Sequence, residues 1–315
     1  MTDHPTVLLA HPIFGDGTEP LAAAIRERLP DDVDLRVGHD EAETHRHAPD
    51  ADILVTHRLD PELRETAPVR WVQTLSAGVD SYDLDAFRES GVVLTNASGI
   101  HARPIADHVL GALLHFERRF DRAVAQQRDR EWARYGAGEL ADRTVCVVGV
   151  GAIGSRVSEL CLALGTDVVG VKRDPSSAPD GVDCVTPDEL GEALARSDRV
   201  VLACPLTDET RGLIGREELD ALGEDGVLVN IARGEVVDEG ALTEALRDDR
   251  LRGAALDVFE EEPLPEDSLL WGMENVLATP HVAGTTPHYW ERAADIFAEN
   301  YRRYRAGEDL RNRVV

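Results

Sequence analysis

The chain has 315 residues, with 60 acidic residues against 33 lysines and arginines and a formal net charge of −27. This charge disfavours nucleic-acid binding, and because 43% of the residues are hydrophobic it does not indicate disorder. No apolar run approaches the ~20 residues that a membrane helix needs, and the first residues carry no basic segment typical of an export signal. We therefore expect a cytoplasmic protein that contacts neither nucleic acid nor membrane.

The acidic excess comes with an almost complete loss of lysine. Lys172 is the only lysine in the chain, and the carboxylates are spread along the sequence instead of forming one block. At molar salt the screening length falls to about 3 Å, which suppresses repulsion between such charges. The composition resembles that of proteins from organisms with a salt-rich cytoplasm, so we expect a halophilic origin.

Alternating strand and helix patterns predict an α/β fold with two Rossmann-like, doubly wound parallel-sheet domains and a cleft between them. Strands of the first domain are expected at residues 7–10, 33–37, 53–55, 69–75 and 92–94, with a helix at 19–29. A long amphipathic stretch at 104–130 precedes the second domain, whose six expected strands lie at 145–148, 168–171, 200–202, 227–229, 253–256 and 276–278. The predicted domains are 1–98 plus 286–315, which bind substrate, and 99–285, which bind a dinucleotide.

The sequence Gly149-Val-Gly151-Ala-Ile-Gly154 follows a strand pattern and opens a helix pattern. Gly149 permits a tight turn, Gly151 lets backbone N–H groups approach a pyrophosphate, and Gly154 lets the helix pack on the strand. The positive end of the helix then faces the anion. This context predicts a nicotinamide dinucleotide site.

The strand at residues 168–171 is followed by Lys172-Arg173-Asp174, where an NAD enzyme has an acidic residue that binds the ribose hydroxyls. Two cations suit the 2′-phosphate of NADP, so we predict NADP as the preferred cofactor, with NAD tolerated. Asp174 keeps the opposite preference open, since it serves NAD if the strand ends later. A solvated charged turn is the third interpretation.

Each of the last three predicted strands ends in a polar sequence, and in an open parallel sheet such ends line the ligand site. Reduction of a 2-oxo acid needs a cation for the carboxylate, a proton donor for the carbonyl oxygen, and a group that orients the donor and favours its protonated form. Arg233, His281 and Glu262 supply these functions in this order. Spacing alone cannot choose among the consecutive Glu260, Glu261 and Glu262.

Five segments together resemble the D-isomer-specific 2-hydroxyacid dehydrogenase family in order and spacing: GVGAIG, CPLTDETRGLI, VNIARGEVVD, GAALDVFEEEPLP and TPHVAG. The resemblance extends over nearly the whole chain. It implies catalytic roles for Arg233, His281 and the glutamate directly before proline, Glu262. It also implies that the loop at Ser76, Ala77 and Gly78 binds the substrate carboxylate together with Arg233 and His281.

The resemblance further implies the cofactor-binding set and a homodimer formed through the cofactor domain. Within this set Asp257 contacts the nicotinamide carboxamide, and the Lys172-Arg173 pair departs from the usual acid of the family. The expected cofactor-binding residues are Gly149, Gly151, Ala152, Ile153, Gly154, Lys172, Arg173, Cys204, Pro205, Thr210, Ile231, Asp257, His281 and Gly284.

We therefore predict an NADP-preferring oxidoreductase that reduces 2-oxo acids to D-2-hydroxy acids. Within this class a glyoxylate or hydroxypyruvate reductase and a branched-chain 2-oxo acid reductase remain open, and outside it a non-catalytic protein that senses NAD(P)H. No His/Cys cluster has metal-ligand spacing, so no metal is expected, and four cysteines without CxxC pairing are expected to be reduced.

Several weaker signals receive no assigned role. His57 follows a predicted strand, and His101 lies at the junction of the two predicted domains. Residues that are candidates for contacts with the substrate side chain, or equally for the core, are Ile13, Phe14, His288, Tyr289 and Trp290.

Overall fold

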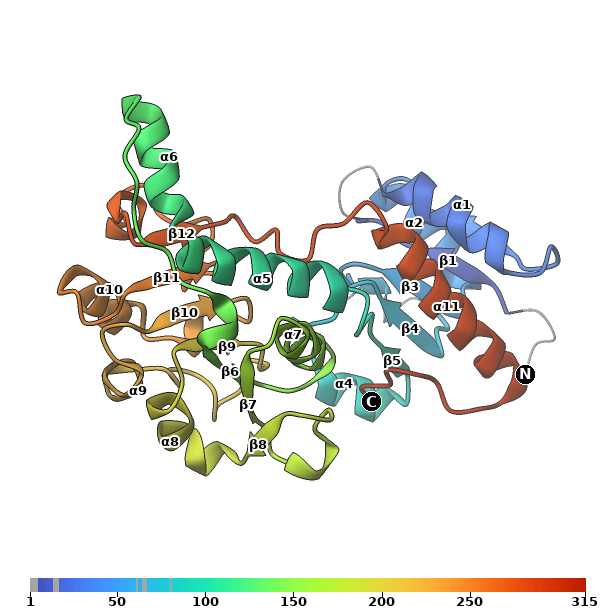
Figure 1. Cartoon of the computed structure of the whole chain (residues 1–315). Helices are drawn as coiled ribbons and strands as arrows, with labels where there is room; N and C mark the ends of the chain where they lie inside the picture. Colours follow the sequence, from blue (N-terminus) through green and yellow to red (C-terminus); the bar gives the residue numbers. More distant parts are fainter. Residues whose placement is uncertain (1–4, 14–16, 61, 64–66, 80) are drawn as a thin grey trace. The chain divides into compact units, whose positions relative to one another are not determined.

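The computed structural model describes residues 5–13, 17–60, 62–63, 67–79 and 81–315. The chain forms two compact units, which are considered separately (Figure 1). Unit 1 contains Met1–His101 and Thr286–Val315, and unit 2 contains Ala102–Thr285. Each unit has one parallel β-sheet with helices on both faces, so the predicted fold class is confirmed.

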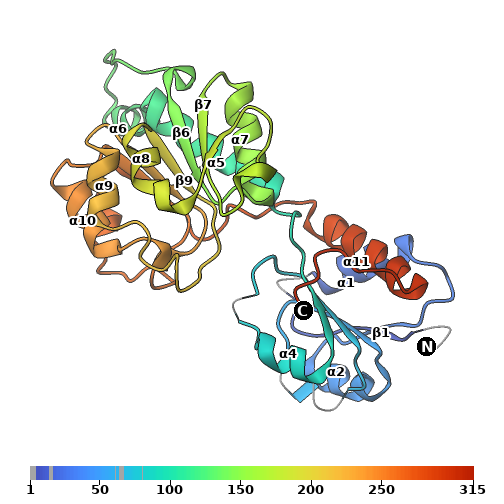
Figure 2. The same ribbon diagram turned by 90° about the horizontal axis from the view of Figure 1, so that it is seen from below.

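Unit 1 contains a five-stranded parallel sheet with the order β2-β1-β3-β4-β5. Its strands are β1 (Val7–Leu9), β2 (Leu35–Val37), β3 (Ile53–Thr56), β4 (Trp71–Thr74) and β5 (Val93–Thr95). Helices α1 (Thr18–Arg28) and α11 (Tyr289–Ala306) cover one face and lie side by side (Figure 2). The helices α2 (Glu41–His47) and α4 (Leu84–Ser90) belong to the opposite side, where the 3₁₀ turn η1 (Ala48–Asp50) also packs. Every residue of β1, β3 and β4 is buried, and because successive side chains point to opposite faces of the sheet, both faces are apolar.

The last helix, α11, belongs to unit 1 although it follows the whole of unit 2 in the sequence. Trp71 on β4 is fully buried and stacks on Phe297 and Tyr304 of α11, with ring centroids 5.4 and 5.5 Å apart. Its indole N–H donates a hydrogen bond to the hydroxyl of Thr95, at 2.8 Å. The ring contacts fix α11 on the sheet. The hydrogen bond to Thr95 satisfies the polar atom of the indole, so the rings can be buried without an unpaired N–H group.

Unit 2 contains a seven-stranded parallel sheet with the order β12-β11-β10-β9-β6-β7-β8. The strands are β6 (Thr144–Val148), β7 (Asp167–Val171), β8 (Asp183–Val185), β9 (Arg199–Leu202), β10 (Val227–Asn230), β11 (Gly253–Leu256) and β12 (Val276–Ala278). The expected number of six strands was wrong, because the sequence analysis missed β8, a three-residue edge strand with an exposed Asp183.

Helices cover both faces of this sheet. Val145 and Val147 of β6 pack against α5 (Ala102–Arg118) and α7 (Ala152–Ala163). Cys146 and Val148 point to the other face, where α8 (Leu190–Ala195), α9 (Arg216–Leu222) and α10 (Glu239–Arg247) lie. The 3₁₀ turns are η2 (Leu140–Asp142), η3 (Pro175–Ser177), η4 (Pro187–Glu189), η5 (Gly234–Val236) and η6 (Leu269–Gly272). In the described part of the chain no helix is both long enough and apolar enough to cross a membrane.

The amphipathic stretch at 104–130 is divided between two helices. Arg119 has a φ of 53°, and this left-handed residue separates α5 from α6 (Phe120–Asp129). Helix α6 buries none of its residues and projects from unit 2 (Figure 1). We call residues 119–137 the arm. Phe120, Val124 and Trp132 on the arm are exposed, and Trp132 is 100% exposed.

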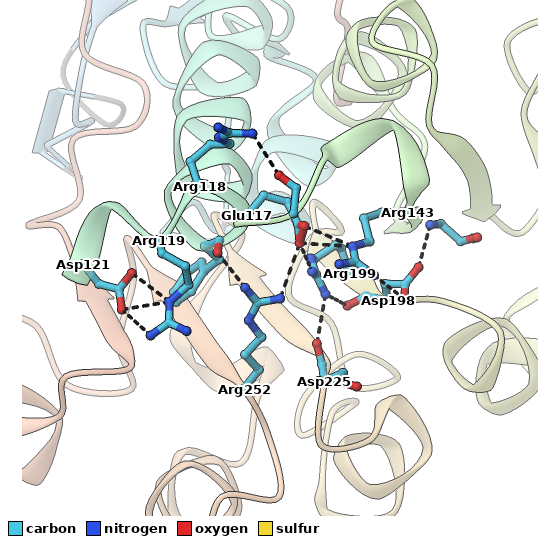
Figure 3. Close-up of polar contacts among 12 residues, drawn as sticks. Glu117, Arg118, Arg119, Asp121, Arg143, Asp198, Arg199, Asp225 and Arg252 are labelled. Carbon is cyan, nitrogen blue, oxygen red and sulfur yellow. Dashed lines mark hydrogen bonds and ion pairs between the residues drawn. The ribbon is translucent and has the colours of Figure 1, made fainter. Parts of the chain in front are cut away.

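A buried ion cluster lies at the base of the arm (Figure 3). The carboxylate of Glu117, at the end of α5, is 0% exposed and contacts the guanidinium groups of Arg143, Arg199 and Arg252. Burial acts to raise the pKa of Glu117, but hydrogen bonds and ion pairs with Arg199 and Arg143 hold that pKa below its usual value. Arg143 directly precedes β6, Arg199 is the first residue of β9, and Arg252 directly precedes β11. The cluster therefore joins α5 to the N-terminal ends of three strands.

Candidate active site

The glycine-rich turn connects β6 to α7. Gly149 has a φ of 95°, which favours glycine, and a Cβ there would lie 2.6 Å from the Cα of Cys204. A Cβ on Gly154 would lie 2.1 Å from the carbonyl oxygen of Gly149, whereas a Cβ on Gly151 would meet nothing within 4 Å. Two of the glycines therefore permit close packing of the chain, and the third leaves open space at the N-terminus of α7, where Ala152 and Ile153 begin the helix.

The loop after β9 lies against this turn. The sheet order reverses between β6 and β9, and such a switch point is where open α/β sheets bind ligands. The hydroxyl of Thr210 donates to the carbonyl oxygen of Pro205, at 2.6 Å, and accepts from the N–H of Thr207, at 2.8 Å. These bonds close the loop that starts at Cys204. Burial raises the pKa of the Cys204 thiol to about 11, so this cysteine is not a thiolate near neutral pH.

The charged residues after β7 are arranged by a short turn. Oδ1 of Asp174 accepts hydrogen bonds from the hydroxyl and the N–H of Ser176, at 2.6 and 3.1 Å. These bonds, followed by the charge of Lys172, lower the pKa of Asp174. Lys172 donates from Nζ to the carbonyl oxygen of Ser177, at 3.2 Å, and Arg173 is exposed. The carboxylate thus caps η3, and two cations lie directly after the strand.

Glu262 and His281 are in direct contact. Nδ1 of His281 lies 2.8 Å from Oε2 of Glu262, and Oε1 of Glu262 accepts from the N–H of Phe259, at 3.1 Å. Glu260 instead accepts from the N–H of Glu239, at 3.3 Å. The geometry therefore distinguishes Glu262 from Glu260, which spacing in the sequence could not do.

Asp257 organises the loop that carries His281. Its side chain is 3% exposed, and Oδ1 accepts from the Thr279 hydroxyl and from the N–H of Val282, at 2.5 and 2.9 Å. Oδ2 accepts from the N–H of Ala283, at 2.8 Å, next to Gly284. Thr279, directly after β12, belongs to the polar segment expected at this strand end but has no role assigned from the sequence.

Arg233 lies in the loop after β10. The side chain of Asn230 holds this loop by donating to the carbonyl oxygen of Arg233, at 2.9 Å, and accepting from the N–H of Ala232, at 3.0 Å. Ile231, between Asn230 and Ala232 in the sequence, is buried. A Cβ on the next residue, Gly234, would lie 1.9 Å from the carbonyl carbon of Phe259, so this loop closely approaches the one that leads to Glu262.

The loop at Ser76, Ala77 and Gly78 belongs to unit 1. The Ser76 hydroxyl donates to the carbonyl oxygen of Gly78, at 2.8 Å, and Asn96 donates to that of Ala77, at 2.7 Å. The hydroxyl of Tyr289 donates to the carbonyl oxygen of Leu75, at 2.6 Å. Three carbonyl groups are held by side chains, and this fixes the orientation of the peptide groups in the loop.

The other candidates have varied environments. Ile13 is a core residue, and a Cβ on Gly17 would lie 1.9 Å from the ring of Trp290, so both residues pack within unit 1. His288 is exposed, and Phe14 lies outside the described residues. In the described part of the chain, Glu41, His45 and Asp60 bring three possible metal ligands within 4.8 Å of one another. None of these three is among the predicted catalytic residues.

Comparison with known proteins identifies the family. Residues 110–283 match the NAD-binding domain of the D-isomer specific 2-hydroxyacid dehydrogenases. The chain belongs to this family. A D-3-phosphoglycerate dehydrogenase of Methanocaldococcus jannaschii is 33% identical over 94% of the chain, which spans 58% of the length of that relative. A glyoxylate reductase of Aeropyrum pernix is 35% identical to this chain, and the match covers 83% of this chain and 82% of that reductase.

The fold of this dehydrogenase family member also matches solved structures. A D-isomer specific 2-hydroxyacid dehydrogenase from Xanthobacter autotrophicus, in complex with NADPH and MES, superimposes with a TM-score of 0.88. The two proteins are 32% identical, and the match covers 99% of this chain and 98% of the other.

Proposed function

We propose that this dehydrogenase family member reduces 2-oxo acids to D-2-hydroxy acids with NADPH and accepts NADH less well. The observation that carries the proposal is the contact between Glu262 and His281, whose Oε2 and Nδ1 atoms lie 2.8 Å apart. A carboxylate at one ring nitrogen leaves the other, Nε2, to exchange a proton with substrate. The family membership supports the same reaction class.

The catalytic residues have separate tasks in this proposal. The guanidinium of Arg233 binds the substrate carboxylate and polarises the neighbouring carbonyl. His281 donates a proton from Nε2 to the carbonyl oxygen, and the carboxylate of Glu262 stabilises the protonated ring by accepting a hydrogen bond from its Nδ1–H group. NADPH, when bound, supplies the hydride. The N–H groups of Ala77 and Gly78 are also assigned to the substrate carboxylate, in the loop whose carbonyl groups are held by Asn96 and Ser76.

The cofactor site fits a dinucleotide. Open space at Gly151 and the N-terminus of α7 suit the pyrophosphate, with Cys204 and Pro205 beside the turn. Lys172 and Arg173 suit a 2′-phosphate, while Asp174 is engaged in capping η3. The similar dehydrogenase from Xanthobacter autotrophicus contains NADPH, which supports this preference. Asp257 fixes the loop after β12. In this proposal it also contacts the nicotinamide carboxamide.

Two further properties belong to the proposal. The exposed Phe120, Val124 and Trp132 on the arm support a homodimer formed through unit 2, because large apolar side chains are normally covered by a partner. The net charge of −27 with a single lysine supports a halophilic, cytoplasmic protein.

Two other functions remain as alternatives. The match to a glyoxylate reductase supports a glyoxylate or hydroxypyruvate reductase, which differs from the main proposal only in the substrate. A non-catalytic NAD(P)H sensor on the same scaffold is the alternative from another class. The contact between His281 and Glu262 argues against it, because a sensor does not need a proton donor.

The test is a panel of 2-oxo acids with NADPH or NADH, each in molar KCl and in dilute buffer, followed by nicotinamide absorbance. We expect faster turnover with NADPH and in KCl. Turnover with NADH alone would overturn the assignment of Lys172 and Arg173. Nucleotide binding without turnover of any acid would support the sensor. The variant Arg233→Ala should lose turnover but keep nucleotide binding if the protein is an enzyme, and no difference between this variant and the wild-type protein would also support the sensor.

A further inference from the structure

A set of polar side chains joins helix α5 to the loop that carries His281. Nε2 of His108, on α5, lies 3.4 Å from Oγ1 of Thr279, which directly follows β12. The same hydroxyl oxygen lies 2.5 Å from Oδ1 of Asp257, which directly follows β11. All of these residues belong to unit 2. We call His108, Thr279 and Asp257 the support triad.

The direction of the hydrogen bonds in the support triad follows from the chemistry of the three groups. The Asp257 carboxylate is an acceptor, so the single proton of the Thr279 hydroxyl is donated to it. The hydroxyl oxygen can then only accept from His108, and Nε2 of that imidazole must carry a proton. The bonds therefore run from the imidazole through the hydroxyl to the carboxylate, and each depends on the one before it.

Asp257 in turn holds the backbone around the proton donor. Its Oδ1 and Oδ2 atoms accept from the N–H groups of Val282 and Ala283, at 2.9 and 2.8 Å. Its backbone carbonyl oxygen accepts from the N–H of His281, also at 2.9 Å. Three consecutive N–H groups thus bind one residue, and two of them bind the carboxylate that Thr279 orients.

The backbone at His281 needs such support. Its φ is 52°, a left-handed conformation that is uncommon for residues other than glycine. A strained conformation of this kind persists where the surrounding contacts impose it. With this backbone, Nδ1 of the ring lies 2.8 Å from Oε2 of Glu262. Relaxation of the backbone to an ordinary conformation would turn the ring away from the glutamate.

We propose that His108 and Thr279 are positioning residues, which orient the Asp257 carboxylate and thereby keep His281 in the conformation that faces Glu262. This inference rests on the proposed function, because it assumes that His281 gives its proton to the substrate. The two residues act through Asp257 and do not touch the acid. Their loss should therefore lower kcat more than it raises KM, since a misdirected proton donor slows the chemical step.

The test uses two pairs of substitutions. Thr279→Val removes the hydroxyl at nearly constant size, and Thr279→Ser keeps it. His108→Leu removes the N–H donor, and His108→Gln keeps a donor at a similar reach. The matched control is His115→Leu, which replaces another half-buried histidine about two turns further along α5.

Two readouts are measured on each variant. The first is kcat and KM with NADPH and the 2-oxo acid that the wild-type protein reduces fastest. The second is amide hydrogen exchange at residues 281–283, which reports how firmly the loop is held and requires no turnover. The double variant His108→Leu/Thr279→Val completes a cycle that shows whether the two residues act through the same group.

We expect Thr279→Val and His108→Leu each to lower kcat about tenfold, to change KM less than about threefold, and to speed exchange at residues 281–283 about tenfold. The double variant should lose no more than either single variant, because both act on the same carboxylate. Thr279→Ser, His108→Gln and His115→Leu should remain within about threefold of the wild-type protein in both readouts.

The outcomes separate this inference from the function on which it rests. Unchanged exchange at residues 281–283 in either Thr279→Val or His108→Leu would overturn the inference, as would additive losses of kcat in the double variant. Equal effects of His115→Leu and His108→Leu would show only a general contribution of α5 to stability, and would also overturn it. No turnover of any acid by the wild-type protein would contradict the proposed function, while the exchange measurement would still decide whether the support triad holds the loop.

Discussion

Glu262 holds the ring of His281 with one carboxylate oxygen and its own loop with the other. Oε2 lies 2.8 Å from Nδ1 of His281, and Oε1 accepts the N–H of Phe259, at 3.1 Å. The orientation of the carboxylate is therefore set by the backbone before substrate arrives. A group fixed in this way orients a proton donor without further rearrangement.

Replacing the carboxylate of Glu262 by an amide tests its proposed role in supporting His281. We expect Glu262→Gln to lower kcat tenfold to a hundredfold with little change in nucleotide Kd, because the amide keeps the shape but not the charge that stabilises a protonated ring. Steady-state kinetics and nucleotide titration measure the two effects. Glu261→Gln is the matched control, since it changes the adjacent exposed residue. Equal effects of the two substitutions would refute the assigned role.

We expect the cations after β7, Lys172 and Arg173, to determine the preference for NADPH over NADH. Arg173→Ala and Lys172→Ala are each expected to raise the Kd for NADPH about tenfold and leave that for NADH within about twofold, since a lost charged hydrogen bond is worth about 1.5 kcal/mol or more. Calorimetric titration of both nucleotides gives the comparison. Arg156→Ala on α7, which removes an exposed arginine paired with Glu159, serves as the control. Parallel losses for NADPH and NADH would argue that neither cation contacts a 2′-phosphate.

Alanine substitutions of two glycines in the turn after β6 should affect different properties, stability for Gly154 and nucleotide binding for Gly151. Gly154→Ala places a methyl group 2.1 Å from the Gly149 carbonyl oxygen, so we expect a clear loss of unfolding free energy, on the order of 2 kcal/mol. Gly151→Ala meets no atom within 4 Å, so we expect near wild-type stability but at least tenfold weaker nucleotide binding. Denaturant titrations and binding measurements distinguish the two. Normal nucleotide binding by Gly151→Ala would contradict the assignment of the open space to the pyrophosphate.

The neutral state of His101 makes stability depend on pH. Its pKa falls from 6.5 to about 4 in the folded protein, so the folded chain binds fewer protons than the unfolded chain between these values. Stability is therefore unaffected above about pH 6.5 and is lost as the pH falls toward 4. We expect His101→Gln to lose less unfolding free energy than the wild-type protein over this range, by about 2 kcal/mol. Denaturant titrations at several pH values measure this difference, and parallel curves for the two proteins would disprove it.

The ion cluster at Glu117 should be sensitive to loss of its carboxylate. Glu117→Gln leaves three arginines without their shared anion, two of them partly buried and Arg199 1% exposed. We expect a loss of about 3 kcal/mol of unfolding free energy. Glu299→Gln is the control, because Glu299 also pairs with two arginines, Arg303 and Arg311, but in contact with solvent. Similar losses in the two variants would show that burial does not determine the energy of the cluster.

The sequence predicted the elements whose pattern is strong. The strands at Val145–Val148 and Val227–Val229 are continuous apolar runs, as expected for strands covered on both faces, and both appear in the larger sheet. Strand β8 has only Cys184 and Val185 as half-buried apolar residues, which gave too little pattern to recognise. The break at Arg119 was also invisible, because arginine has no preference for a left-handed conformation and the amphipathic pattern continues across it.

The candidate site shows a similar division. The motifs predicted Arg233, Glu262 and His281 as a set. The contacts that distinguish Glu262 from Glu260 required the fold, which places Glu262 next to His281 and Glu260 next to Glu239. The proximity of His57 and His101 could not be predicted either, because these residues are 44 positions apart in the chain and the order of β3, β4 and β5 brings them to the same edge of the sheet.

The two ends of the arm are joined by hydrogen bonds. The N–H of Gly138 donates to the carbonyl oxygen of Glu117, at 2.9 Å, and Arg118 donates to the carbonyl oxygen of Gly138, at 3.1 Å. The chain therefore leaves and re-enters unit 2 at nearly the same point. Because both ends of the arm are joined by these bonds, we expect that residues 119–137 can be shortened or replaced without disturbing the sheet of unit 2.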